Sequence, residues 1–165
     1  MGLNTENLFV RTKASQDVVV AIEEHVGRAV EDGARSATWP LDRGAPRSEG
    51  IRARKISVSD ARDGWVAVVE STEMALPNLA IFLSERLKTR VVIVQFYEVT
   101  GSWGVAFVDD GTVSGGPTYH DAHDPSQALR DALTREGISF SPILFRETVG
   151  KNANGWQTLV QRGTG

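Results

Sequence analysis

The sequence predicts an α+β fold in which a mainly antiparallel sheet is built on a βαββαβ, ferredoxin-like core. Two observations lead to this prediction. Runs of β-branched and aromatic residues are interspersed with two amphipathic helical stretches, and the order is strand, helix, strand, strand, helix, strand. Such a sheet carries both helices on one face. A length of 165 residues indicates a single domain, with its core at about 8–113 and a C-terminal extension at about 114–165.

The first unit is a strand followed by a helix. A short apolar run at 8–10 predicts the strand, and Ser15 is a good N-cap for the helix, in which apolar residues then recur at helical spacing. The helix is expected to end at 32–33, where Gly33 supplies the left-handed cap. The locally basic stretch 34–50 holds two prolines and two glycines, and we expect an irregular connection there that faces solvent.

The second unit begins with a hairpin. Ile56 and Val58 alternate with serines, which predicts a half-buried strand, and the turn at 61–64 leads into a partner strand at 65–69. Pro77 suits the first turn of a helix, and the apolar residues after it form one stripe. The following strand, at 91–99, opens with four continuous apolar residues, so we expect it to be central and buried on both faces.

The extra hairpin strand at 103–108 ends at an Asp-Gly turn, after which a short strand is expected at 112–113. Gly104 indicates a bulge or a close backbone approach within that strand. The Gly-Gly-Pro sequence at 115–117 is expected to break the chain. Asp124 and Pro125 predict the start of a last helix that ends at Gly137. Beyond it we expect irregular structure at 138–149, a short strand at 156–160 and a frayed end at 161–165.

Composition narrows the classes of function. The formal net charge of −3 and the lack of an aromatic and basic RNA-binding strand weigh against nucleic acid. The absence of cysteine excludes disulfides and thiolate metal sites and fits a reducing compartment. No apolar run approaches the length of a membrane span, and no signal peptide is read at the N-terminus, so a cytoplasmic location is expected. Phosphate-binding, dinucleotide-binding and nucleophile-elbow motifs are missing from the sequence, and no cofactor is predicted.

The segment His120-Asp121-Ala122-His123-Asp124 is the most reactive-looking cluster. Imidazole and carboxylate groups bind zinc, iron or manganese, so His120, Asp121 and His123 are candidate metal ligands. These residues precede a helix, however, and no helical spacing fixes their relative geometry. The alternative is that they are surface turn residues, with Asp124 serving as the helix N-cap.

Exposed aromatic and basic side chains are the second kind of candidate. A binding surface is expected around the loops 34–50 and 118–124, and its candidate residues are Trp39, Arg43, Arg47, Trp103 and Tyr119. The alternative for tryptophans at strand positions, Trp65 and Trp103 among them, is that they belong to the core.

Isolated titratable residues are the third kind of candidate. His25 lies on or beside the apolar face of the first helix, where a packed imidazole is expected and a titratable group facing a cleft is the alternative. Glu70, Glu73 and Glu98 lie near element ends and could serve in acid–base chemistry if they converged, but solvated carboxylates are expected.

The stretches GWVAVVES, LAIFLSERL and VVIVQFYEVTGSWGVAFVDDG resemble, in style, small bacterial cytoplasmic proteins, some of which are immunity partners of secreted toxins. The resemblance spans 65–111 and carries no functional residues. We therefore expect a non-catalytic interaction module whose partner is another protein, with toxin neutralisation as one concrete form and a homodimer expected by fold analogy. The alternatives are a metal-dependent hydrolase that uses the 120–124 loop and a small-ligand-sensing domain.

Overall fold

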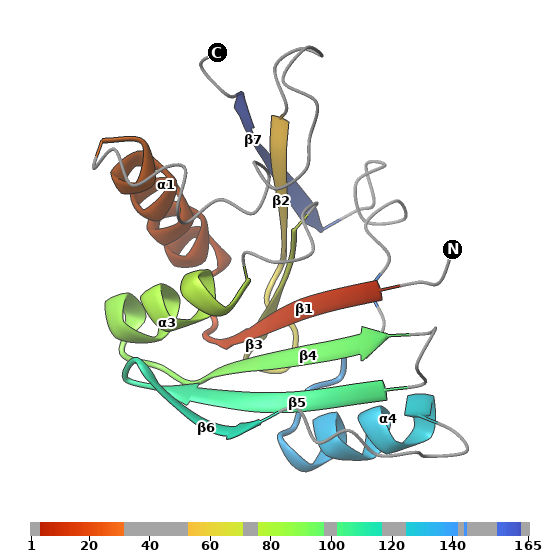
Figure 1. The fold of residues 1–165 in the computed structure, drawn as a ribbon. Coiled ribbons are helices and arrows are strands. Elements are labelled where there is room, and N and C mark those ends of the chain that lie inside the picture. Colours follow the sequence, from red (N-terminus) through yellow and green to blue (C-terminus); the bar gives the residue numbers. More distant parts are fainter. Residues whose placement is uncertain are drawn as a thin grey trace.

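The computed structural model describes residues 4–31, 53–70, 76–97, 102–116, 125–141, 144 and 155–162. The strands are β1 (Asn4–Arg11), β2 (Ala53–Ser59), β3 (Trp65–Glu70), β4 (Val91–Tyr97), β5 (Ser102–Asp109), β6 (Thr112–Gly116) and β7 (Trp156–Arg162). The helices are α1 (Ser15–Glu31), α3 (Leu76–Leu87) and α4 (Pro125–Arg135). These strands form one antiparallel sheet in the order β6-β5-β4-β1-β3-β2-β7 (Figure 1).

The predicted α+β class and the mainly antiparallel sheet are confirmed, but the sheet is larger than the predicted core. Along the described chain the first elements follow the expected order, from β1 and α1 through β2, β3 and α3 to β4. Strands β5 and β6 extend the sheet beyond β4. At the other end, β7 pairs with β2 along its whole length, so the C-terminal extension contributes a strand to the same sheet.

Both faces of the sheet are covered. Helices α1 and α3 pack on one face, where valines, leucines and isoleucines of β1 to β4 form the larger hydrophobic cluster (Figure 1). Helix α4 lies on the opposite face together with Ile138 and Phe140, which follow it. This second cluster is richer in aromatic residues and includes Phe9, Trp65 and, at its partly buried margin, Trp103. We call these the α1/α3 face and the α4 face.

The burial of β4 confirms one prediction, and that of β2 overturns another. Residues 91–94 are all buried, as expected for a central strand covered on both faces. In β2, however, Ser57 and Ser59 are only 6% and 3% exposed, so the strand is not half-buried. Strands β3 and β7 flank β2 on both sides, so the short serine side chains lie between neighbouring strands and not at a sheet edge.

A β-bulge follows β2 and explains why a buried serine is needed there. Val58 pairs with Val68, and the next bridged pair toward the turn is Arg62 with Trp65. The chain advances four residues from Val58 to Arg62 but only three from Trp65 to Val68, so the β2 side carries one extra residue. Ser59 lies at this step. Its hydroxyl accepts the Ala67 N–H at 2.8 Å and so satisfies a buried donor in place of a backbone carbonyl.

Two tight Asp-Gly turns close hairpins as predicted. Asp63 and Gly64 have φ of 52° and 83°, and Asp110 and Gly111 have φ of 47° and 79°. Positive φ at both central residues is the type I′ conformation, whose twist matches that of the flanking strands.

Several element boundaries differ from the predictions. Strand β6 runs from Thr112 to Gly116, so the two glycines expected to break the chain belong to the strand. The β4–β5 register is continuous past Gly104, so the strand has no bulge there. Strand β7 includes Gln161 and Arg162, which were expected to be frayed.

The last helix confirms its predicted boundaries. Helix α4 begins at Pro125. After the helix ends, Gly137 adopts φ of 76°, and the Ile138 N–H donates to the Leu133 carbonyl at 2.9 Å.

The predicted loop at 34–50 and most of 142–154 lie outside the described residues. None of the helices in the described ranges combines the length and the apolar character required to cross a bilayer.

Candidate functional site

Most of the predicted site residues lie outside the described part of the chain. Trp103 lies within the described residues; the remaining candidates, His120, Asp121, His123, Trp39, Arg43, Arg47 and Tyr119, lie outside them. The same holds for Glu73 and Glu98, whereas Glu70 is the last residue of β3.

Three of the four tryptophans belong to the hydrophobic cluster of the α4 face. Trp65 is 4% exposed, and Trp103 and Trp156 pack against the cluster at its margin. Trp103 pairs across the ladder with Phe96, which packs on the same cluster. For these positions the core alternative describes the structure better than an exposed aromatic patch does.

His25 packs between the two helices of the α1/α3 face. Its ring lies 4.8 Å from the Phe82 ring, centroid to centroid, at an angle of 41°. Next to it, Glu24 on α1 accepts two hydrogen bonds from Arg86 on α3, at 2.8 and 3.0 Å. The imidazole thus has the packed position expected of it, at the interface of α1 with α3.

The sheet register assembles a polar row that the sequence analysis did not identify. Continued by one residue to Arg90, which directly precedes β4, the sheet register places Asp109, Arg90, Arg11, Trp65 and Arg62 at successive positions across β5, β4, β1, β3 and the β2–β3 hairpin. Directly opposed residues of an antiparallel ladder project to the same face. Trp65 belongs to the cluster of the α4 face, so the three arginines also project to that face. We call this set the arginine row.

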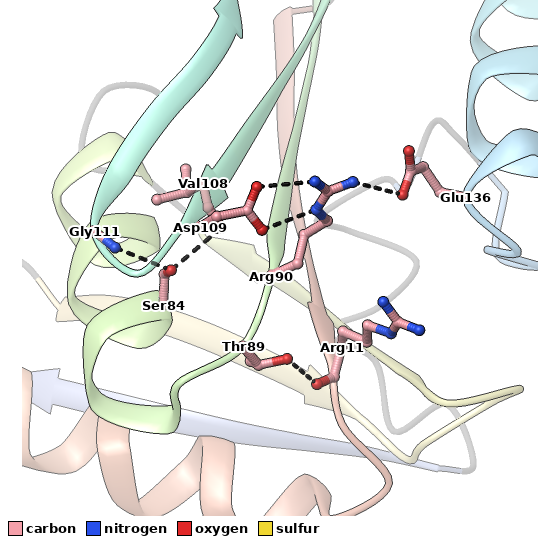
Figure 2. Close-up of polar contacts among 8 residues, drawn as sticks. All are labelled: Arg11, Ser84, Thr89, Arg90, Val108, Asp109, Gly111 and Glu136. Carbon is pink, nitrogen blue, oxygen red and sulfur yellow. Dashed lines mark hydrogen bonds and ion pairs between the residues drawn. The ribbon is translucent and has the colours of Figure 1, made fainter.

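Arg90 is the structural centre of the row (Figure 2). Its Nε and Nη2 donate to the two carboxylate oxygens of Asp109, each at 2.9 Å, and its Nη1 donates to Glu136 Oε2 at 3.3 Å. The guanidinium carbon also lies 5.2 Å from the centre of the Phe107 ring. Arg90 therefore connects β4 to β5 and to the end of α4.

The Arg90 contacts shift the pKa values of this pair. The hydrogen bonds from Arg90 lower the pKa of the Asp109 carboxyl, and the positive charge lowers it further, although partial burial acts in the opposite direction. The same hydrogen bonds, with the one to Glu136, raise the pKa of Arg90. Both groups are consequently held in their charged forms.

Neighbouring hydrogen bonds fix the backbone that carries the row. The buried Ser84 hydroxyl donates to the Val108 carbonyl and accepts the Gly111 N–H, both at 3.2 Å, which ties α3 to the β5–β6 turn (Figure 2). Thr89 Oγ1 donates to the Arg11 carbonyl at 2.6 Å, which ties the start of β4 to the end of β1. The Ser84 hydroxyl thus has a structural role, since both its donor and its acceptor functions are used.

Arg11 and Arg62 differ from Arg90 because neither has a carboxylate partner among the described residues. Arg11 is exposed, and Figure 2 shows its guanidinium on the same side of the strands as that of Arg90. Arg62 is also exposed, and its guanidinium carbon lies 4.6 Å from the centre of the Phe140 ring. Asp60 and Asp63 share the β2–β3 connection with Arg62, but neither forms an ion pair with it in the described structure.

This arrangement suits binding rather than proton transfer. A guanidinium is a permanent cation with five N–H donors, and its planar fork matches the two oxygens of a carboxylate. The Arg90–Asp109 pair shows that geometry within the protein itself. In the described ranges, no group of three or more His, Cys, Asp or Glu side chains is arranged to hold a metal ion.

No local pattern in the sequence identifies the arginine row. Arg11, Arg62 and Arg90 each lie beside a predicted strand end, but only the strand order and register place them together.

Comparison of the chain with protein-family models, with curated proteins and with solved structures finds no match.

Proposed function

We propose that the protein is a non-catalytic interaction module that binds an acidic segment of another protein through Arg11 and Arg62. One observation carries the proposal: two exposed guanidiniums without carboxylate partners among the described residues lie on one face, beside a third that is already paired with two carboxylates. Charge complementarity with a partner's aspartates or glutamates completes the row in the way that Asp109 completes Arg90.

The spacing of the row favours a peptide with more than one carboxylate. Arg11 and Arg62 are separated by two strand spacings, which is about 10 Å between their backbones. Side chains on one face of an extended segment recur every second residue, so carboxylates two or four residues apart are separated by about 7 or 13 Å, and these distances bracket the separation of the two arginines. The arginine side chains are long enough to adapt to either spacing, so the row favours an acidic stretch rather than one defined sequence.

Neutralisation of a secreted toxin in the cytoplasm is one concrete form of this function. A partner with an acidic docking segment fits the arginine row whether or not it is a toxin.

We also infer a ferredoxin-like core, supported by the neighbouring strands β4-β1-β3-β2 and by the position of α1 and α3 on one face. In this arrangement the row lies at one end of that core, on the face opposite α1 and α3.

The test is a capture experiment with charge-neutral variants. The wild-type protein, the double variant Arg11→Gln/Arg62→Gln and the control Arg130→Gln are immobilised and exposed to lysate of the source organism. Arg130 is an exposed arginine on α4, so the control makes the same kind of change elsewhere. Urea unfolding of each variant establishes that it is folded.

We expect one stoichiometric protein to be captured by the wild type and by Arg130→Gln. With the purified partner, the double variant should bind at least tenfold more weakly, and wild-type affinity should fall as salt is raised. Equal binding by wild type and double variant would refute the role of the row. Stoichiometric metal in the purified protein, together with hydrolytic activity, would refute a non-catalytic function.

A further inference from the structure

Five valines form a second transverse row on the opposite face of the sheet. The row runs directly across β6, β5, β4, β1 and β3, and its members are Val113, Val108, Val91, Val10 and Val66. The last four are fully buried under α1 and α3, whereas Val113 at the sheet edge is 47% exposed. The hydrophobic layer of the α1/α3 face therefore reaches the edge strand, where none of the described helices covers Val113 fully.

Strand β6 lacks the usual protection of a sheet edge. Natural edge strands carry lysines, other charges or prolines that discourage pairing with another strand. Strand β6 has the sequence TVSGG, and its residues 112–115 are exposed. At the turn before it, Asp110 is already paired with Lys88 at 2.9 Å. The edge thus presents polar backbone groups and one valine with no charged residue in the strand.

The adjoining turn determines which backbone groups face outward. In a two-residue type I′ hairpin the closing pair, here Asp109 and Thr112, exchanges its hydrogen bonds within the hairpin. Because pairing alternates along an antiparallel ladder, the N–H and C=O groups of Val113 and Gly115 point away from β5. These are the groups that an added strand would pair with.

We infer that the occupant of this edge is β6 of a second copy of the chain, related by a two-fold axis through Ser114. In that arrangement Val113 of each copy lies opposite Gly115 of the other, so two pairs exchange four hydrogen bonds. Gly115 has φ of 74° and no side chain, so each valine meets backbone instead of a bulky group. Two uncharged strands also bring no like charges together.

The hydrophobic layer of the α1/α3 face supports this register. Within one chain, the register places Gly115 beside Ala106, whose row continues inward on the α1/α3 face through Ile93 and Leu8. In the dimer, Val113 of one copy lies beside Gly115 of the other. The valine row of one copy therefore continues into the row of Gly115 and Ala106 in the other. The apolar layer then continues across the dimer without interruption, and Val113 becomes covered.

The size of the interface predicts weak association. Five residues of one edge strand bury far less than the roughly 1,200 Å² of a standard stable interface. We therefore expect a reversible equilibrium between monomer and dimer that depends on protein concentration. This proposal does not rest on the arginine row, which lies on the α4 face.

Disulfide trapping tests the register directly, since the chain contains no cysteine. In Ser114→Cys the two thiols face each other as a non-hydrogen-bonded pair, where Cα atoms are about 4.5 Å apart and a disulfide can form. In the control Thr112→Cys, the two equivalent residues are four positions out of register, about 13 Å apart. We expect rapid covalent dimerisation of Ser114→Cys only. Equal rates for the two variants would overturn the proposed register.

Sedimentation equilibrium tests the association without a cross-link. Val113→Lys places a charge on the edge and should raise the dissociation constant of the dimer at least tenfold. Val20→Lys is the matched control, because Val20 on α1 is a similarly exposed valine, at 41%. A wild-type protein that stays monomeric at millimolar concentration, or equal effects of the two lysines, would overturn the proposal. Capture of an acidic partner through Arg11 would be unaffected by this result.

Discussion

Replacement of Arg90 by methionine tests whether the arginine row stabilises the fold. Methionine keeps most of the apolar stem but removes the guanidinium. The change deletes the two 2.9 Å bonds to Asp109, the 3.3 Å bond to Glu136 and the stacking on Phe107. The variant should therefore loosen the attachment of β4 to β5 and to the end of α4.

The expected magnitude follows from how exposed the pair is. The side chains of Arg90 and Asp109 are 35% and 46% exposed, so water competes for both charges. A bidentate pair of this kind contributes about 1 kcal/mol after solvent screening, and the stacking on Phe107 adds about 0.5 kcal/mol. With a few tenths from the longer Glu136 contact, Arg90→Met should lower the free energy of unfolding by roughly 2 kcal/mol.

A double-mutant cycle separates the pair from the other contacts. Urea unfolding is measured for wild type, Arg90→Met, Asp109→Asn and the double variant, with circular dichroism as the probe. The coupling energy between the two positions should be about 1 kcal/mol. A coupling energy within error of zero would refute the reasoning, because it would mean that the fork geometry adds nothing beyond independent solvated charges.

The pH dependence gives a second test of the same pair. Arg90 lowers the pKa of Asp109 in the folded state below its ordinary value of 3.8. The folded state therefore binds the proton less readily than the unfolded state, so the stabilisation is present above the unfolded pKa and is lost as pH falls through the folded pKa. The stability difference between wild type and Arg90→Met should be constant near neutrality and should shrink below about pH 4. A difference that grows on acidification would contradict this sign.

Three further substitutions test separate parts of the fold by urea unfolding. Gly64→Ala should cost about 1–2 kcal/mol, because φ is 83° and an added Cβ meets no atom within 4 Å, so backbone strain is the only penalty; an unchanged midpoint would contradict the type I′ turn. Ser59→Ala leaves the buried Ala67 N–H without its acceptor and should cost about 1–3 kcal/mol, whereas a neutral result would argue against the bulge. Leu129→Ala removes a fully buried side chain of α4 and should cost about 2–5 kcal/mol; a cost below 1 kcal/mol would show that α4 does not cover its face.

The elements that the sequence predicted well are those specified by local chemistry. The Asp-Gly turns follow from the positive φ that only a few residues accept, and the start of α4 follows from Pro125. The burial of 91–94 follows from an uninterrupted apolar run. In each case a stretch of a few residues contains the information needed.

Features that depend on pairing between distant segments were not predicted. The alternation at Ser57 and Ser59 predicts a half-buried strand, and the sequence contains no local sign that β7 pairs with β2. The arginine row requires the order and register of β4, β1 and β3, because a shift of one residue would move each arginine to the other face. Composition cannot supply this information, since the three arginines are unremarkable in their local contexts.

The pairing of β2 with β7 also has a consequence for how the chain folds. The residues of strand β2 are synthesised well before those of its outer neighbour β7, which is the last strand that the structure describes. Closing so long a loop carries a large entropic cost before any ladder hydrogen bond compensates it, and contacts of this separation slow folding. While the chain is being made, β2 remains an open edge, with Ile56 and Val58 awaiting full burial. Docking of β7 is therefore expected to be a late event, and proteins truncated before Trp156 should be prone to aggregate through β2.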